Sequence, residues 1–276
     1  MQGFWRRYSR SRSGVLGLII LSGVVTVALL APVLYPGNPF QIVGEPFQSP
    51  FGDFLLGTDS LGRNIAAGLA HGARTSLLIG VMATLLAVAV GAFVGGLAGY
   101  YGGWLDDGLM RLTEFFQTIP FFIFAIVLVA ILSPSVQNII MAIAIVTWPP
   151  VARLVRGEFM AMRSRDFVSA SVCLGTSDAA IISRDILPNC LSPIIVKASM
   201  DMGLAILAAA SLGFIGLGAR PPAPEWGAMI SVARTYMPTW WWYAFFPGLF
   251  IYLTVLGFNL FGDGLRDILD PKSNQG

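Results

Sequence analysis

Long apolar stretches separated by short polar segments run along the whole chain, and this pattern predicts its main elements. Each stretch has about 20 residues, enough for a helix to cross ~30 Å of membrane hydrocarbon. Helices are expected because backbone polar groups in lipid must find partners within their own segment. The pattern therefore predicts an all-α integral membrane protein with about six transmembrane helices, near residues 14–34, 77–100, 115–132, 136–155, 193–217 and 244–262.

The segments between the predicted spans are too short and too apolar for a separate soluble domain. Residues 1–276 are therefore expected to form a single transmembrane domain, with long loops at residues 36–76 and 156–192. The first apolar stretch follows an arginine-rich start but is long for a signal peptide, and it lacks an A-x-A cleavage site before Pro36. We expect it to remain as an uncleaved span.

Composition strengthens the membrane assignment. The chain is 55% hydrophobic and only 12% charged, whereas soluble domains carry about a quarter charged residues. The mean hydropathy is +0.73. A water-facing surface cannot be built from this composition, so lipid is an expected partner and nucleic acid is not.

The placement of basic residues predicts the topology, because cytoplasmic segments of membrane proteins are enriched in Lys and Arg. With a cytoplasmic N-terminus, 13 of the 17 basic residues fall inside and only Arg63, Arg74, Arg220 and Arg234 fall outside. Both termini are therefore expected in the cytoplasm, the 36–76 loop outside and the 156–192 loop inside. Cys173 and Cys190 then lie on the reducing side, where a disulfide is not expected.

Several kinds of chemistry are excluded or disfavoured by the residues themselves. His71 is the only histidine, so a multi-histidine metal site cannot form, and a membrane hydrolase would depend on this one residue in an outer loop. The only lysines are Lys197 and Lys272, and neither lies in a G-x-x-x-x-G-K-[ST] phosphate loop. We expect no cofactor in this chain. If ATP drives the protein, another chain must bind it.

Asp201 is notable because it lies about 13 Å inside the fifth predicted span. Lys197 precedes it by four residues, so the two could form an ion pair on one helix face. The alternative is a polar group along a conduction path, which would suit an ion-coupled secondary transporter.

Glycine and proline predict two features of packing. Gly91, Gly95 and Gly99 form a four-residue repeat that would let another helix approach closely. Pro149 and Pro150 should kink or end the fourth span.

The loop between the fourth and fifth spans shows a helical pattern. Phe167, Ala170, Leu174, Asp178 and Ile181 fall at helical spacing, and charged residues flank them. This spacing predicts an interfacial helix, lying at the membrane face or docked on a partner protein.

The same loop resembles the cytoplasmic coupling loop of ABC-importer permeases. That family's pattern is E-A-A, three residues, Gly, nine residues and then Ile-x-Leu-Pro. Here it falls on residues 169–171, 175 and 185–188. Ala170, Gly175, Leu187 and Pro188 match the pattern, whereas Ser169, Ser171 and Asp185 depart from it, with Asp166 the nearest acidic residue.

Further strings resemble the dipeptide, oligopeptide and nickel subfamily of these permeases, in particular the second permease of dipeptide importers. Residues 56–64 (LGTDSLGRN) and 72–77 (GARTSL) are similar to its extracytoplasmic signature, with Asn64 where Asp is usual. Three other strings complete a resemblance that covers nearly the whole chain: residues 212–218 (LGFIGLG), 221–227 (PPAPEWG) and 258–271 (FNLFGDGLRDILDP).

This resemblance implies a type I ABC importer permease fold and half of a pore in a bacterial inner membrane. The implied partners are a second homologous permease, two ATPase subunits that carry ATP and Mg, and an extracytoplasmic substrate-binding protein. Dipeptides or short oligopeptides are the implied substrates, with nickel or another small solute as the alternative.

The resemblance also implies roles for individual residues. The outer mouth or a binding-protein contact would involve Asp59, Arg63 and Arg74, with a purely structural turn over residues 57–63 as the alternative. The ATPase-coupling residues would be Arg165, Asp166, Ser169, Ala170, Ser171, Gly175, Leu187 and Pro188.

Overall fold

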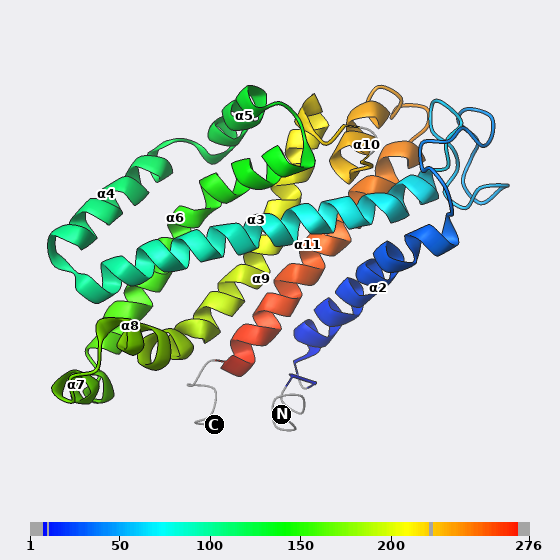
Figure 1. Cartoon of the computed structure of the whole chain (residues 1–276). Helices are drawn as coiled ribbons and strands as arrows, with labels where there is room; N and C mark the ends of the chain where they lie inside the picture. The colour runs from blue at the N-terminus through cyan, green and yellow to red at the C-terminus, as the bar shows by residue number, and fades with distance from the viewer. Residues whose placement is uncertain (1–7, 10, 221–222, 270–276) are drawn as a thin grey trace.

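The computed structural model describes residues 8–9, 11–220 and 223–269, and these form a bundle of tilted helices (Figure 1). The long elements are α2 (Arg12–Leu34), α3 (Ile65–Tyr101), α4 (Gly103–Thr118), α5 (Phe121–Leu132), α6 (Val136–Arg163), α9 (Leu187–Leu212) and α11 (Trp242–Leu269). The short ones are α7 (Asp166–Cys173), α8 (Asp178–Ala180), η1 (Ile181–Ile186), η2 (Gly213–Leu217) and α10 (Trp226–Ala233).

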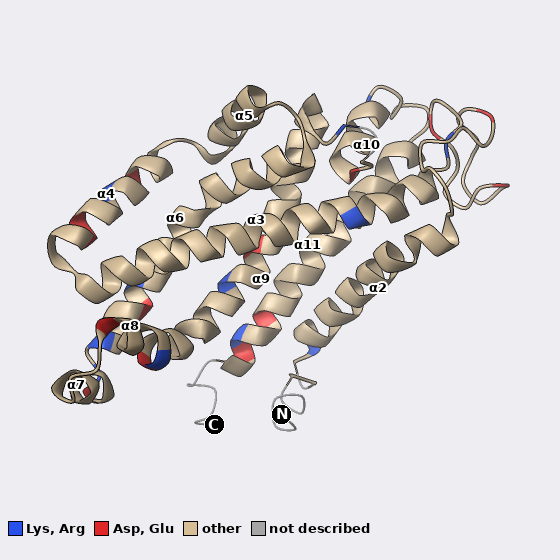
Figure 2. Ribbon diagram, viewed as in Figure 1, with Lys and Arg blue, Asp and Glu red and all other residues tan. Residues whose placement is uncertain are grey.

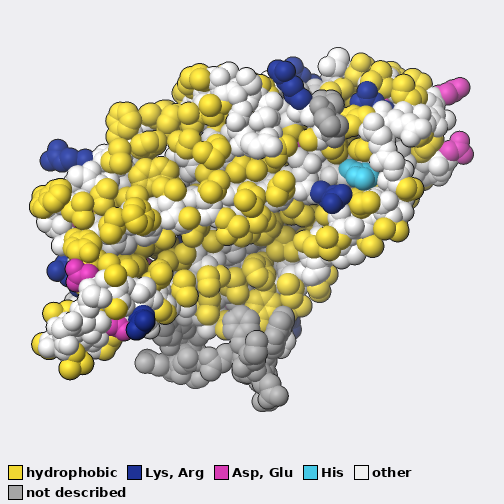
Figure 3. Space-filling view, in the orientation of Figure 1, with side chains coloured by type: hydrophobic (Ala, Val, Ile, Leu, Met, Phe, Trp, Pro, Cys, Tyr) yellow, Lys and Arg dark blue, Asp and Glu magenta, His cyan; other side chains and the backbone are white. Residues whose placement is uncertain are grey.

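Among the described residues, five helical segments are long and apolar enough to cross a membrane, or six if α4 and α5 together count as one bent span. One end of the bundle carries α7 and the start of α2, and the opposite end carries α10 (Figure 1). We call these the α7 end and the α10 end. Charged side chains gather mostly toward the two ends (Figure 2), whereas apolar side chains cover much of the flank between them (Figure 3).

The third predicted span, residues 115–132, is wrong as a single helix. The chain bends by 86° between α4 and α5, at Ile119 and Pro120. Both residues have extended backbone angles, with ψ of 126°. Proline lacks an amide hydrogen and disfavours helical geometry in the preceding residue, so the helix ends where the sequence places Pro120.

Two other helices differ from the sequence-based boundaries. α3 begins at Ile65 rather than near residue 77, because the Asn64 side chain caps it by accepting a hydrogen bond from the Ala66 amide at 2.9 Å. α6 continues through Pro149 and Pro150 instead of ending there. Its packing along α3 stabilises the helix where two backbone hydrogen bonds are lost.

The contact between α3 and α6 confirms that the glycine repeat serves close packing. A Cβ added to Gly95 would lie 2.2 Å from the Ala152 carbonyl oxygen, and one added to Gly99 would lie 2.6 Å from that of Arg156. The two backbones therefore touch over two helical turns. Val151 and Val155 of α6 are fully buried beside this contact.

Replacing Gly95 with Ala is expected to lower the free energy of unfolding by about 1–3 kcal/mol, because the new methyl group overlaps backbone atoms of α6. Gly157→Ala on α6 is the matched control, since nothing lies within 4 Å of a Cβ at that position. Thermal unfolding of the two purified variants in detergent measures the difference. Equal midpoints would show that the helices can separate without cost.

Candidate functional site

The segment between α6 and α9 forms a small helical hairpin at the α7 end (Figure 1). α7 forms its outer arm, and α8 and η1 form the arm that returns into α9. Pro188 lies in the first turn of α9, directly after the wider turns of η1, which continue into α9 without a break. The segment that sequence reasoning singled out is therefore a compact structure of its own.

The single interfacial helix predicted over residues 167–181 is wrong, because α7 ends at Cys173. The Gly175 amide donates to the Val172 carbonyl at 3.0 Å, and the Thr176 amide donates to the Ser171 carbonyl at 3.1 Å. Gly175 adopts a φ of +74°, in the left-handed region. These features form a Schellman motif, which satisfies the last carbonyls of α7 and turns the chain back.

Two positions that depart from the coupling-loop pattern hydrogen bond to each other. The Ser171 hydroxyl on α7 donates to the Asp185 carboxylate on η1 at 2.9 Å. The pattern has apolar residues at both positions, where a hydrogen bond is not available. The two departures therefore act together and tie the arms of the hairpin.

Buried apolar residues anchor the hairpin to the bundle. Val168 of α7 and Ile181 of η1 pack with Phe159 of α6 in one cluster that also contains Tyr100 of α3. The Tyr100 hydroxyl donates to the Asp178 carboxylate at 2.8 Å. The Arg163 guanidinium lies 5.8 Å from the centre of the Tyr100 ring. The ends of α3 and α6 are thus joined to the hairpin.

The outward side of the hairpin is exposed and partly apolar. Leu174 at the turn is 84% exposed, and Val172 and Phe167 are also exposed. Arg165, Asp166, Ser169 and Ala170 lie on the same short helix or just before it and are exposed too. An exposed group of large apolar side chains beside charges is typical of a protein contact.

The residues proposed for the outer mouth lie at the α10 end but do not form one cluster. The Asp59 carboxylate accepts hydrogen bonds from the Leu61 and Arg63 amides, each at 2.8 Å, and so shapes a turn. The Arg63 side chain lines a cavity of ≈180 Å³ together with Asp59, and its Nε is buried without a hydrogen-bond partner among the described residues. Arg74 is exposed on α3 in an adjoining groove.

Glu225 lines the same cavity, and sequence reasoning did not single it out. It is 2% exposed and caps α10 by accepting hydrogen bonds from the Gly227 and Ala228 amides at 2.7 and 2.9 Å. Burial raises its pKa to about 7, and the two amides oppose this shift only in part. The sequence signal that could have identified Glu225 is that it is the only acidic residue in the string 221–227 (PPAPEWG).

Asp201 forms the ion pair with Lys197 that the spacing predicted, and it is buried. Lys197 also lines a cavity of ≈650 Å³ between α6, α9 and α11 at the α7 end, together with Glu158 and Arg266. Lys197, on the same helix, thus balances the charge of the Asp201 carboxylate.

No group of three or more His, Cys, Asp or Glu residues in the described parts of the chain is placed to hold a metal ion. Cys173 is exposed, Cys190 is buried, and neither forms a disulfide.

Two family models together match most of the chain, all but residues 51–86 and the last residue. Residues 87–275 match the family described as binding-protein-dependent transport system inner membrane component. Residues 1–50 match the N-terminal TM domain of oligopeptide transport permease C.

Individual relatives match over nearly their full length. The chain is 42% identical to the dipeptide transport system permease protein DppC of Alkalihalophilus pseudofirmus, over 97% of this chain and 88% of that one. It is 40% identical to the di/tripeptide transport system permease protein DppC of Pseudomonas aeruginosa, over 99% and 92%. It is 41% identical to the glutathione transport system permease protein GsiD of Pectobacterium atrosepticum, over 98% and 90%.

The fold is also similar to that of a chain in the inward-facing MetNI methionine ABC transporter. The TM-score is 0.59, with 73% of this chain and 96% of that chain covered. At 19% sequence identity the likeness concerns the fold alone.

The Ser171–Asp185 hydrogen bond is expected to contribute about 1 kcal/mol to stability. Ser171→Ala and Asp185→Ile should each lower the thermal unfolding midpoint. The double variant restores the family pattern at both positions. It should lower the midpoint by less than the sum of the two single decreases. Strict additivity would show that the two side chains do not interact.

Glu225 should make stability depend on pH in a defined direction. Its pKa is about 7 in the folded chain against an ordinary 4.5, so between these values the folded state holds the proton more tightly than the unfolded state. This contribution to stability is present below pH 4.5 and is lost as the pH rises to about 7.

The Glu225→Gln variant should not lose this contribution to stability as the pH rises. Thermal unfolding measured across the pH range checks this. The informative quantity is the difference in thermal unfolding midpoint between the original chain and the variant at each pH. The contributions of the other titrating groups cancel in this difference. A difference that stays constant from pH 4.5 to 7 would contradict the assignment.

Proposed function

The chain belongs to the binding-protein-dependent transport system inner membrane component family, and from this membership we propose that it forms half of the translocation pore of an ATP-driven importer for dipeptides or short oligopeptides. The observation that carries the proposal is the match of at least 40% identity over nearly the full length of permeases named for dipeptide and di/tripeptide transport. Glutathione is itself a small peptide, so the third relative fits the same substrate class.

The chain is a multi-span permease subunit of an ABC importer and carries no enzymatic activity of its own. Its all-α type I importer fold, predicted from the sequence, is confirmed by the helical bundle and by the likeness to MetNI. ATP hydrolysis takes place on a separate subunit. We propose that the partners are a second homologous permease, two ATPase subunits that bind ATP and Mg, and an extracytoplasmic binding protein.

The placement of charge supports an orientation with both termini in the cytoplasm of a bacterial cell. The α7 end would then face inward, because it carries the start of α2, the end of α11 and the arginines of the hairpin (Figure 2). The α10 end, with the loop that contains Asp59 and Arg63, would face the binding protein.

We propose that the loop over residues 163–190, which contains the hairpin, couples this subunit to an ATPase. Its exposed side, with Leu174, Val172 and Phe167, offers an apolar surface for docking. Its buried side joins α3 and α6 through the Phe159 cluster and the Tyr100–Asp178 hydrogen bond. Movement of a docked ATPase would therefore displace the ends of two spans together and rock them between outward- and inward-facing states.

The Lys197–Asp201 pair supports ATP-driven transport over ion coupling. A carboxylate that couples transport to an ion must gain and release that ion in each cycle, whereas Asp201 is already paired with the half-buried Lys197 of its own helix. We propose that the pair lies near the inner part of the translocation path. Nickel or another small solute remains the alternative cargo.

Co-expression of the chain with a second permease, ATPase subunits and a binding protein, followed by mass spectrometry and uptake in proteoliposomes, tests the function. We expect ATPase subunits to copurify and uptake of labelled dipeptide to require ATP and the binding protein. Leu174→Glu should abolish copurification and uptake without unfolding the chain, because the side chain is 84% exposed and contributes little to the core.

Phe51→Glu is the matched control, since Phe51 is 78% exposed at the opposite end of the bundle. It should leave ATPase binding intact. ATP-independent uptake by the unmodified chain would refute the function. Intact copurification of Leu174→Glu would refute the role of the hairpin surface.

A further inference from the structure

α4 carries a continuous polar stripe although it runs beside two membrane spans. Asp107, Arg111, Glu114 and Thr118 are spaced by four, three and four residues, so they lie on one helix face. All four are exposed. The stripe extends from the fifth residue of the helix to its last residue.

The bend after α4 places this stripe at membrane depth. α5 has 12 residues, ~18 Å of helix, and turns 86° away from α4, so it cannot carry the chain across the bilayer alone. α4 must cover much of that depth, and it runs alongside α3 and α6 (Figure 1). Glu114 lies ~16 Å along α4 from the α7 end.

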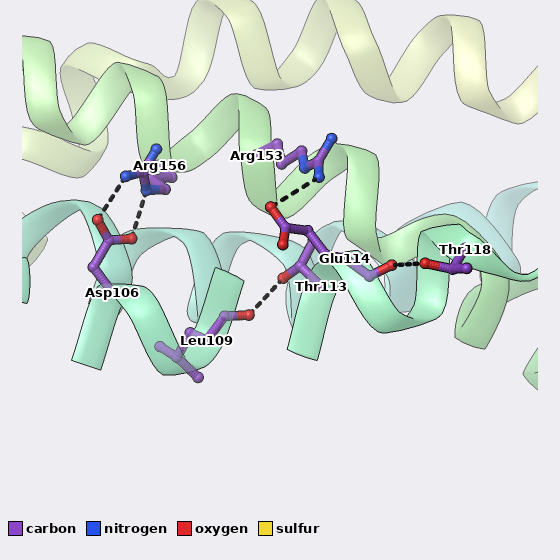
Figure 4. A network of polar contacts seen from close by, with 7 residues as sticks. All are labelled: Asp106, Leu109, Thr113, Glu114, Thr118, Arg153 and Arg156. Carbon is purple, nitrogen blue, oxygen red and sulfur yellow. Dashed lines mark hydrogen bonds and ion pairs between the residues drawn. The ribbon is translucent and has the colours of Figure 1, made fainter. Parts of the chain in front are cut away.

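Two ion pairs connect this helix to α6, and they have different environments (Figure 4). Asp106 and Arg156 form a bidentate pair at 2.5 and 2.6 Å, with the Asp106 side chain 13% exposed. This pair is tight and faces inward, so it clamps α4 to α6.

The second pair, Glu114 and Arg153, lies further along the same contact between α4 and α6 (Figure 4). Its charged atoms are 3.7 Å apart, and the side chains are 63% and 49% exposed. The separation exceeds a hydrogen-bond distance, so both groups keep free bonding capacity. An open pair of this kind can bind a further charged molecule.

Exposed charges at this depth are costly in lipid, and they normally face water or protein. The stripe contains both acidic and basic side chains. The Glu114–Arg153 pair is 3.7 Å apart and is not closed by a hydrogen bond. Such a surface suits water and a passing polar solute. The core of a permanent protein interface is instead depleted of charged residues.

Resting on the proposed function, we propose that the stripe formed by Asp107, Arg111, Glu114 and Thr118 on α4 borders the water-filled passage, and that Glu114 and Arg153 contact the two charged ends of the peptide cargo. A short peptide carries an ammonium group and a carboxylate a few ångströms apart. The Glu114 carboxylate would bind the ammonium group of the peptide, and the Arg153 guanidinium would bind its carboxylate. A pair of opposite charges can thus guide a zwitterion without a net attraction strong enough to trap it.

Cysteine labelling tests whether the stripe is wet. In a Cys173→Ser, Cys190→Ala background of the assembled importer, Arg111→Cys and Thr118→Cys should react with a charged, membrane-impermeant thiol reagent. Leu112→Cys is the control, because Leu112 is exposed on the same helix but lies off the stripe. It should react at least about tenfold more slowly, as a thiol reacts only where the thiolate is hydrated.

Uptake by the same importer tests the contact with cargo. Glu114→Gln and Arg153→Gln should each lower dipeptide uptake about five- to tenfold, equivalent to ~1–1.4 kcal/mol. ATP hydrolysis stimulated by the loaded binding protein should stay within about twofold, because neither residue belongs to the hairpin. Leu112→Ala should leave both rates unchanged.

Stripe cysteines that resist labelling in every nucleotide state, or that cross-link to the second permease instead, would overturn the passage assignment. Full uptake by both Gln variants would overturn the contact with cargo. These results are distinct from a failure of the proposed function, in which the unmodified importer itself would show no ATP-dependent uptake.

Discussion

The direct backbone contact between α3 and α6 is the constraint on which the rest of the structure depends. Gly95 and Gly99 let α6 approach until its carbonyl oxygens lie where side chains would otherwise be. This fixes the end of α6, and with it Phe159, against the end of α3. The hairpin then packs on both helices at once, because Val168 and Ile181 fill the space around Phe159. A looser contact would leave the hairpin attached to one span only.

The same contact connects the hairpin at the surface to the helices inside the bundle. Tyr100 at the end of α3 holds Asp178, and Arg163 at the end of α6 lies over the Tyr100 ring. Two turns earlier on the same face of α6, Arg156 binds Asp106 and so links α4 to α6. The spans α3 and α6, the hairpin and the polar stripe of α4 therefore form one mechanically connected unit. Motion of the hairpin need not be transmitted through flexible loops.

Sequence reasoning found the hairpin segment but not its shape. Helical spacing over residues 167–181 predicted one helix, since a periodic pattern does not reveal where a turn interrupts it. Gly175 was the signal for the interruption, and its left-handed φ with two closing hydrogen bonds decided the geometry. Ser171 and Asp185 appeared as two separate departures from a family pattern. Only the folded hairpin shows that they are one interaction.

The sequence by itself determined the membrane location, the number of apolar segments and the local Lys197–Asp201 pair. These follow from composition, length and four-residue spacing, which act within one helix. The tertiary structure alone decided the Asp106–Arg156 and Glu114–Arg153 pairs, the burial of Glu225 and the exposure of one face of α4. These depend on which helices pack together and on the bend at Pro120. Residues 50 positions apart, such as Asp106 and Arg156, become neighbours only when the chain has folded.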